Sequence, residues 1–229
     1  MIRRDSRHRL FGSDRSSETF EGVERMSIRR AGQVSPDTTT GEIGQGFDAR
    51  LIAMTGVMIA VVFVLTRFIT FTIGPGGYLH LGDIAVFASA FLFGPLVGFI
   101  AGGVGTALAD LNLGYNAWAP GTFIIHGLQG FAAGWIAWRR GLTPMIIGAI
   151  VGGAILVIGY FLYQWAMVSA GSLDPDEGET AFATAANYLT ANLFQGFVGA
   201  VVAIPLVLAV RQAYPPIRRW GAGPSWVEE

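Results

Sequence analysis

Residues 77–120 constrain the fold more than any other part of the chain. They form two apolar, glycine-rich runs joined only by the short segment 93–95, and each run has one carboxylate at its edge, Asp83 or Asp110. A carboxylate at the edge of a membrane-spanning segment is costly unless it has a partner or a function. The segment therefore predicts a membrane protein with a polar site near one face.

The composition of the whole chain agrees with a membrane protein. Of 229 residues, 52% are hydrophobic and 14% are charged, whereas charged residues make up about 25% of soluble domains. The net charge is −1 and the arginines form no basic patch, so nothing indicates a nucleic-acid partner. Because there is no cysteine, neither disulfides nor thiolate metal ligands are available. We expect a multi-pass protein of the cell membrane with no metal site.

The chain divides into three regions. Residues 1–46 are polar and charged without a sustained apolar period, so we expect a disordered cytoplasmic tail, in which Met26 is an alternative start to Met1. Residues 47–212 predict an all-α membrane domain of six helices, at roughly 49–71, 82–93, 95–111, 118–138, 142–168 and 183–211. Residues 213–229 predict a short cytoplasmic tail, because Pro215 and Pro216 end the last helix.

The arginines set the predicted orientation of these helices. If all six helices span the membrane, one side receives Arg50, Arg139, Arg140, Arg211, Arg218 and Arg219. The loops on the other side, 72–81, 112–117 and 169–182, contain neither Lys nor Arg. This is the positive-inside pattern, and it predicts that both termini are cytoplasmic.

Polar side chains recur at helical spacing and gather in one half of the membrane. The residues that share helix faces are Thr122, His126 and Gln129, then Tyr160 and Gln164, then Tyr188, Asn192 and Gln195 beside Asn187. Asp110, Tyr115 and Trp118 lie at a helix end and in the loop that follows. Most of these polar residues fall in the outer half of the membrane or just above it, and the inner halves of the helices are apolar. A channel needs a polar path throughout, so the asymmetry predicts a pocket open to the outside above a sealed inner half.

The same residues also fit a role in helix packing. Thr106, Thr122 and Gln195 are interpreted first as links between helices. Asp83 fits a position near a helix N-terminus, where the helix dipole favours an anion. For His126, a ligand-binding role and a buried hydrogen bond are equally compatible with the sequence.

Small residues spaced four apart indicate where helices approach closely. The pairs are Gly98 and Gly102, Gly130 and Gly134, Gly148 and Gly152, Gly196 and Ala200, and Ala49 and Ala53. Such pairs let helix backbones come near each other inside a membrane. They face either another helix of this chain or a helix of a partner.

An ordered set of short motifs resembles a known family. The motifs are Gly77-Tyr78-Leu79-His80-Leu81-Gly82-Asp83, Phe93-Gly94-Pro95, Gly102-Gly103, Ala107-Leu108-Ala109-Asp110, Gly114-Tyr115, Ala119-Pro120 and Ile124-Ile125-His126-Gly127-Leu128. Over residues 48–211 the chain resembles the substrate-binding S components of energy-coupling factor (ECF) vitamin transporters, in the riboflavin-transporter-like group.

The resemblance implies a function and partners. An S component captures a vitamin from outside the cell; riboflavin is the first candidate here, with a thiamine precursor, a pyridoxine-like compound or a corrinoid as alternatives. It works with a transmembrane coupling subunit and two ATPase subunits, so ATP is used only by the partners and this chain needs no cofactor. Ala49 and Ala53 resemble the coupling-subunit contact. Residues 71–81 resemble the family's loop that closes over the ligand. The residues expected to gate the pocket are Gly77, Tyr78, His80 and the neighbouring Asp83.

We expect the substrate to be bound in the outer pocket. The predicted binding residues are Asp110, Tyr115, Trp118, His126, Gln129, Tyr160, Gln164, Asn187, Tyr188 and Asn192. Trp118 or Tyr115 is expected to stack on a flat ring, while Asp110 and the amides read its edges. Many relatives carry Lys and Glu where this chain has His126 and Gln129, so a relative's substrate does not transfer directly.

Two other classes of protein remain as alternatives. A small intramembrane enzyme would use Asp110 and His126 as acid and base, but the chain has no convincing nucleophile or metal-binding motif. A structural membrane subunit without a ligand would not explain why the polar faces favour one half of the bilayer. The sequence therefore favours a vitamin-binding subunit, and it predicts no enzyme activity.

Overall fold

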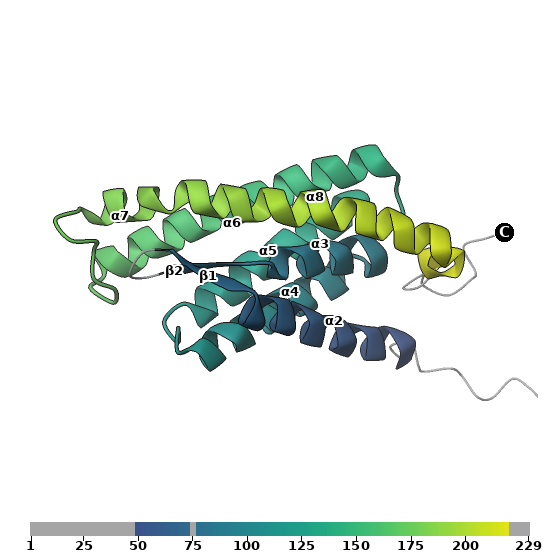
Figure 1. Cartoon of the computed structure of the whole chain (residues 1–229), viewed down its shortest axis with the longest axis horizontal. Helices are drawn as coiled ribbons and strands as arrows, with labels where there is room; N and C mark the ends of the chain where they lie inside the picture. Colours follow the sequence, from purple (N-terminus) through teal and green to yellow (C-terminus); the bar gives the residue numbers. More distant parts are fainter. Residues whose placement is uncertain (1–48, 74–76, 220–229) are drawn as a thin grey trace, which may run out of the picture. The chain divides into compact units, whose positions relative to one another are not determined.

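The computed structural model describes residues 49–73 and 77–219 of the chain, within the compact unit that begins at Phe47. The predicted tail 1–46 lies outside the described residues, and so does 220–229 at the other end. The described part is a bundle of helices that carries one short β-hairpin (Figure 1).

The helices follow the predicted order. They are α2 (Ala49–Phe68), α3 (Gly82–Phe93), α4 (Pro95–Leu113), α5 (Ala119–Ala137), α6 (Leu142–Ser169), α7 (Ala181–Asn187) and α8 (Leu189–Ala213), followed by the 3₁₀ turn η1 (Pro215–Arg219). Helices α2, α4, α6 and the α7–α8 pair are long and apolar enough to cross a bilayer. With α7 and α8 counted as one interrupted span, the prediction of six helices and an all-α membrane fold is confirmed. The cytoplasmic location of both termini stays a prediction.

Two details of the predicted helices were wrong. The helix predicted at 183–211 is divided at Tyr188, whose φ of −91° and ψ of −6° keep it close to helical geometry, so the division is a local break in one rod. The first helix ends at Phe68 and does not continue to residue 71. The next residues, Thr70–Ile73, alternate β-branched and aromatic side chains, which favour strands over helices.

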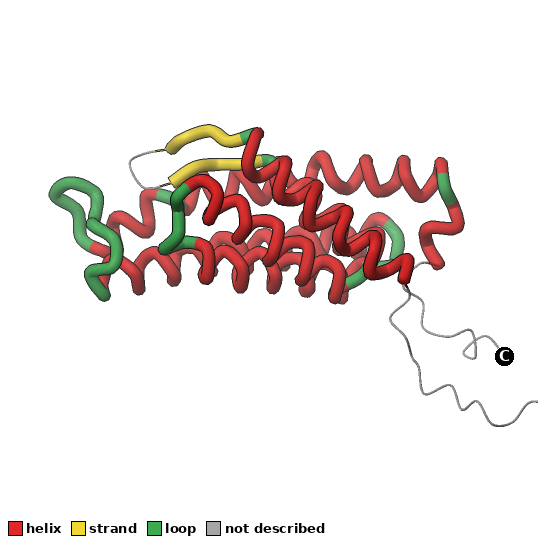
Figure 2. The backbone as a smooth tube through the Cα atoms, turned by 90° about the horizontal axis from the view of Figure 1, so that it is seen from below, coloured by secondary structure: helices red, strands yellow, loops and turns green. Residues whose placement is uncertain are grey.

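The segment predicted as an outer loop is instead a β-hairpin. Strands β1 (Thr70–Ile73) and β2 (Gly77–His80) pair in antiparallel register, with Thr70 opposite His80. The Leu81 amide donates to the Ile69 carbonyl at 3.3 Å and closes the base of the hairpin. The hairpin, yellow in Figure 2, lies at one end of the bundle. We call this end, with the turn 114–118 and the loop 170–180, the hairpin end.

Helix α3 forms the centre of the bundle. Every residue of α3 except Ile84 is buried, and the helix packs against α2, α4, α5 and α8. Phe87 and Phe91 stack on its inner face with ring centroids 5.8 Å apart. Because α3 starts directly after β2, the central helix fixes where the hairpin leaves the bundle.

Glycines allow α4 and α5 to cross with their backbones in contact. A Cβ added at Gly98 would lie 2.7 Å from the Gly130 carbonyl oxygen, and one added at Gly102 would lie 2.7 Å from the His126 carbonyl oxygen. Real side chains do not tolerate such distances to a backbone atom. The predicted close approach is therefore made between two helices of this chain, and it sets the depth at which α5 presents its polar face.

At the opposite end of the bundle lie the start of α2, the turn between α5 and α6 and the end of α8 (Figure 1). These segments contain Arg50, Arg139, Arg140 and Arg211, so we call it the arginine end. Arg211 of α8 is 5% exposed there. Its Nη1 donates to the Arg140 carbonyl at 2.6 Å and its Nη2 donates to the Phe91 carbonyl at 2.7 Å. One buried side chain thus joins α8 to the end of α3 and to the turn between α5 and α6.

Candidate functional site

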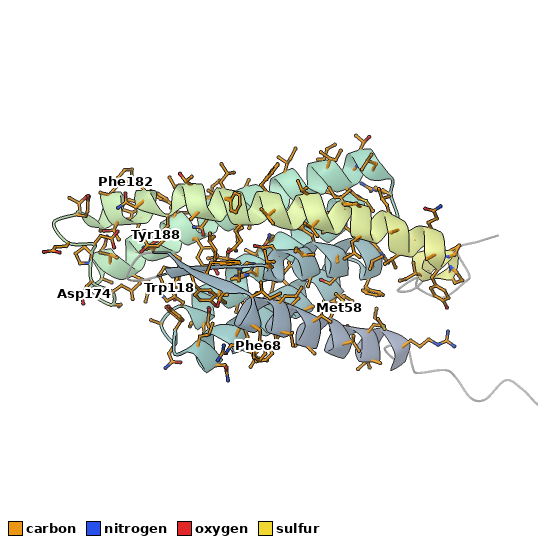
Figure 3. The ribbon with its side chains drawn as sticks, in the orientation of Figure 1. Met58, Phe68, Trp118, Asp174, Phe182 and Tyr188 are labelled. Atoms are coloured by element: carbon orange, nitrogen blue, oxygen red, sulfur yellow. The ribbon has the colours of Figure 1, made fainter. Side chains whose placement is uncertain are left out.

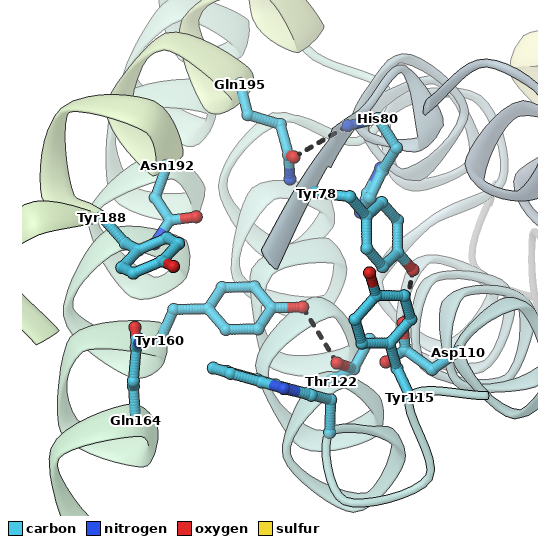
Figure 4. Close-up of a pocket in the computed structure, with 11 residues that line it drawn as sticks. Tyr78, His80, Asp110, Tyr115, Thr122, Tyr160, Gln164, Tyr188, Asn192 and Gln195 are labelled. Carbon is cyan, nitrogen blue, oxygen red and sulfur yellow. Dashed lines mark hydrogen bonds between the residues drawn. The ribbon is translucent and has the colours of Figure 1, made fainter. Parts of the chain in front are cut away.

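A pocket opens at the hairpin end, between the hairpin and four helices. Its lining residues are Tyr78, His80, Asp110, Tyr115, Trp118, Thr122, Tyr160, Gln164, Tyr188, Asn192 and Gln195 (Figure 4). They come from β2, the end of α4, the following turn, α5, α6 and the start of α8. Figure 3 shows Trp118 and Tyr188 at this end of the bundle. The space that the centre of a water molecule can reach inside the pocket is about 50 Å³.

Aromatic rings form two walls of the pocket. Tyr78 of the hairpin and Tyr115 of the α4–α5 turn face each other with ring centroids 5.0 Å apart. Trp118 lies 6.1 Å from the ring of Tyr160 on α6. Rings in these positions offer flat apolar surfaces with hydroxyl groups at their edges, which suits a planar ligand.

Asp110 is held at one edge of the pocket by the hairpin. The Tyr78 hydroxyl donates a hydrogen bond to Asp110 Oδ1. Burial, and next the neighbouring Asp110 carboxylate, raise the pKa of Tyr78 well above its usual value, so its hydroxyl stays a donor. The hydroxyls of Thr122 and Tyr160 share a hydrogen bond of 3.0 Å beside this pair. Within the described part of the chain, Asp110 Oδ2 is buried and has no hydrogen-bond partner.

His80 connects the hairpin to α8 and to the start of α3. Its backbone amide donates to Gln195 Oε1 at 3.1 Å, and its ring Nδ1 accepts from the Gly82 amide at 3.1 Å. Burial lowers the pKa of His80 to about 4, the effect of nearby Asp83 being opposite and smaller. The ring is therefore neutral near pH 7, and its one proton is on Nε2.

A second polar group lies buried beneath the pocket. Asp83, His126 and Gln129 are each 0% exposed. His126 Nδ1 forms a hydrogen bond of 2.7 Å with Gln129 Oε1, and it lies at an ion-pair distance of 3.2 Å from Asp83 Oδ1. The His126 ring contacts two rings of the lining, those of His80 and Tyr160, at centroid distances of 5.3 and 5.7 Å. This cluster forms a floor that the sequence alone did not separate from the pocket.

The structure brings together most of the predicted binding residues, and it places three of them elsewhere. Asp110, Tyr115, Trp118, Tyr160, Gln164, Tyr188 and Asn192 line the pocket. His126 and Gln129 are not lining residues, because they lie one and two helical turns below Thr122 on α5. There they bond to each other, and His126 Nδ1 lies 3.2 Å from Asp83 Oδ1. Asn187 is exposed on α7, where its amide donates to Asp176 Oδ2 at 3.3 Å.

Two lining residues were interpreted from the sequence as packing residues. Thr122 and Gln195 both line the pocket. The available signal was helical spacing, since Thr122 stands four residues before His126 and Gln195 three residues after Asn192. Thr106, interpreted in the same way, bonds to its own helix through the Gly102 carbonyl at 2.6 Å.

The remaining predicted residues have different surroundings. Of the gating group, Tyr78 and His80 line the pocket, Gly77 begins β2, and Asp83 belongs to the floor. Ala49 begins α2 and Ala53 is exposed on it. Gating and partner contact stay predictions. Among residues 49–73 and 77–219, no three His, Asp or Glu side chains gather as they would around a metal ion.

Residues 46–212 match the family described as "ECF-type riboflavin transporter, S component". The chain is 32% identical over 127 residues to the "Thiamine precursor transporter HmpT" of Lactococcus lactis subsp. cremoris, covering 52% of this chain and 73% of that protein. It is 43% identical over 98 residues to a Pyrococcus woesei protein described as an "Uncharacterized protein in gap 3'region". That match covers 42% of this chain and 64% of the Pyrococcus protein.

Two solved structures share the fold. One is titled "Structure and mechanism of the S component of a bacterial ECF transporter", with a TM-score of 0.58, 20% identity, and coverage of 73% of this chain and 98% of that one. The other is titled "Crystal structure of FolT bound with folic acid", with a TM-score of 0.55, 21% identity, and coverage of 69% and 92%. At these identities the likeness concerns the fold alone.

Proposed function

The chain belongs to the riboflavin-transporter family of ECF S components, and we propose that its pocket binds a small, single-ring heteroaromatic vitamin or vitamin precursor. Members of this family are substrate-binding, multi-pass subunits of the plasma membrane and are not enzymes. What the family does not settle is the substrate, which has to be argued from the residues of this pocket.

The observation that carries the proposal is the pairing of aromatic walls with polar ends. Tyr78, Tyr115, Trp118 and Tyr160 supply flat surfaces, and Asp110 stands at one edge. Gln164 and Asn192 supply amides at the other edge, and Gln195 stands next to the hairpin, beside His80 (Figure 4). A flat ring with hydrogen-bonding groups on its rim fits this distribution, because apolar faces and a few placed polar groups are what small-ligand sites combine.

Size favours a single ring. Pockets for drug-sized ligands typically span about 300–1,000 Å³, whereas here the space reached by the centre of a water molecule is about 50 Å³. The three fused rings and sugar-alcohol chain of riboflavin need more room than a pyrimidine or a pyridine, and a corrinoid needs far more. The relative named as a thiamine precursor transporter supports the same choice. We therefore place a pyrimidine thiamine precursor first and riboflavin second.

The floor of the pocket supports capture rather than conduction. Below the lining lies the buried cluster of Asp83, His126 and Gln129, and below that the apolar core around Phe87 and Phe91. A channel needs a continuous polar path. With the arginine end cytoplasmic, as the positive-inside pattern predicts, the pocket faces outward and substrate enters beside the hairpin.

Import from such a pocket needs partners. We propose that a transmembrane coupling subunit and two ATPase subunits complete the transporter and that only they use ATP. The exposed small-residue face of α2, which includes Ala53, is the surface that we assign to the coupling subunit. Small residues allow close helix contact without a hydrophobic driving force.

The proposal is tested by identifying the small molecule that the purified protein carries. Full-length protein is extracted in mild detergent and denatured, and the released compounds are measured by mass spectrometry. A stoichiometric single-ring vitamin or precursor is the expected result. Protein that is empty is titrated with a thiamine precursor, pyridoxine and riboflavin. If none binds, the proposed function is wrong.

A pair of asparagine variants tests whether binding occurs in this pocket. Asn192→Leu removes an amide from the lining, while Asn187→Leu makes the same change on the exposed face of α7. Loss of one good hydrogen bond predicts affinity weaker by roughly tenfold for Asn192→Leu. Asn187→Leu is expected to bind like wild type. Equal affinities for the two variants would remove Asn192 from the site.

A further inference from the structure

One carboxylate oxygen of Asp110 has no hydrogen-bond donor in the described chain, and this indicates which functional group the ligand brings to it. Asp110 stands in the last turn of α4, is 2% exposed and lines the pocket. Its Oδ1 accepts from Tyr78, but Oδ2 is buried with no partner in the described chain. Thr122 also lies beside the carboxylate and shares a hydrogen bond with Tyr160 in which either hydroxyl can be the donor, but neither hydroxyl reaches Oδ2 within hydrogen-bond geometry.

The rest of the lining does not neutralise this carboxylate. Among the described residues that line the pocket there is no Arg or Lys, and His80 is the one histidine. The His80 ring uses Nδ1 to accept from the Gly82 amide, so it is neutral and carries its single proton on Nε2. His126 is paired with Asp83 in the floor. Asp110 is therefore the one acidic residue among the described side chains that line the pocket, and no cationic side chain of the lining pairs with it.

A buried acceptor without a donor destabilises a protein by about 1–3 kcal/mol, and more when the acceptor is charged. A ligand that brings a donor to Oδ2 removes this penalty on binding, whereas a ligand that brings a carbonyl oxygen or a bare C–H does not. Sites with buried polar groups reject analogues that lack the matching group for this reason. The unpaired oxygen therefore favours substrates that carry a hydrogen-bond donor at this position over substrates that lack one.

Resting on the proposed function, we propose that Asp110 is a specificity-determining residue that selects heteroaromatic rings with an amino group at the edge facing α4. Aminopyrimidines have that feature. The isoalloxazine ring of riboflavin places its N–H between two carbonyl groups, which a carboxylate repels. Tyr78 keeps Asp110 in place through Oδ1 while Oδ2 receives the amino N–H.

The test compares two ligands of nearly equal shape on the full-length protein in detergent. One is 4-amino-5-hydroxymethyl-2-methylpyrimidine, and the other carries hydrogen in place of the amino group. Calorimetric titration of wild-type protein is expected to show at least about tenfold tighter binding of the amino compound, the value of one hydrogen bond to a charged group. A wild-type ratio near one overturns the inference.

Variants assign the ratio to Asp110. Asp110→Asn keeps the shape but replaces a charged acceptor with a neutral one, which lowers the ratio by about five- to tenfold. Asp174→Asn makes the same change in the exposed loop before α7 and is expected to leave the ratio unchanged. An unchanged ratio in Asp110→Asn overturns the inference. If that variant does not fold, as judged by size-exclusion chromatography, the wild-type ratio alone decides.

The two proposals fail in different ways. If neither pyrimidine, nor pyridoxine, nor riboflavin binds wild-type protein, the proposed function is wrong and the role of Asp110 falls with it. If a single-ring compound binds wild-type protein but the amino group makes no difference, only the role of Asp110 is wrong. Tighter binding of riboflavin than of the aminopyrimidine also contradicts the proposed selectivity.

Discussion

Replacing His80 with asparagine should make the protein less sensitive to acid. His80 is 6% exposed and its pKa is lowered to about 4, mainly by burial, from a usual 6.5. Below pH 6.5 the unfolded chain therefore binds a proton at this residue that the folded chain does not. Stability is complete above pH 6.5, falls as the pH drops, and levels off below pH 4.

The two pKa values give the size of the effect. A difference of one pKa unit corresponds to about 1.4 kcal/mol, so the full loss below pH 4 is about 3 kcal/mol. Between pH 7 and pH 5, where the folded ring is still neutral, the loss is about 2 kcal/mol. Asparagine offers Oδ1 to the Gly82 amide in place of Nδ1 and does not titrate, so His80→Asn should lose about 2 kcal/mol less over this interval.

The assay is equilibrium unfolding in mixed micelles at pH 7 and pH 5, for wild type and His80→Asn. Asp83 and His126 lie near His80 and are present in both proteins, so the quantity compared is the difference between the two pH-dependent losses of stability. Parallel loss of stability in wild type and variant would refute the conclusion that His80 is buried in its neutral form.

Two further changes test the packing that positions the pocket. Gly98→Ala places a Cβ 2.7 Å from the Gly130 carbonyl oxygen and should destabilise by about 1–3 kcal/mol. Gly153→Ala, which meets nothing within 4 Å, should be neutral or slightly stabilising in the same unfolding assay, and similar values for both would contradict the crossing of α4 and α5. Arg211→Met removes the donors to the Phe91 carbonyl, which is buried, and to the Arg140 carbonyl, which is partly buried. It should cost several times more than Arg139→Met, because a buried acceptor left without a donor costs about 1–3 kcal/mol. Equal thermal stability of these two variants would show that Arg211 does not join the helices.

Residue chemistry and spacing were sufficient for the class of the protein and for most of the pocket. The long apolar runs predicted membrane helices. The carboxylates at their edges predicted a polar site, because a charged group in a membrane segment is costly unless it has a partner or a function. Helical spacing placed Tyr160 with Gln164, and Tyr188 with Asn192, because residues three and four apart share a face in any helix. The glycine pairs predicted close helix contacts, and in the structure the backbone of Gly98 on α4 contacts the backbone of Gly130 on α5.

Only the tertiary structure decided how deep each polar side chain lies in the bundle and which residue it contacts. His126 and Gln129 lie on the same face of α5 as Thr122. The backbone contact of α4 with α5 and the packing of α3 bring Asp83 beside them, so they form the floor of the pocket and do not line it. The hairpin was read as a loop, because four-residue strands depend on pairing that local sequence does not encode. The pairing of Tyr78 with Asp110 joins residues 32 positions apart. The sequence by itself determined which side chains were polar and which helix face carried them. The fold decided which of them face a ligand, because a hydrogen bond inside a membrane protein depends on which helices meet and at what depth.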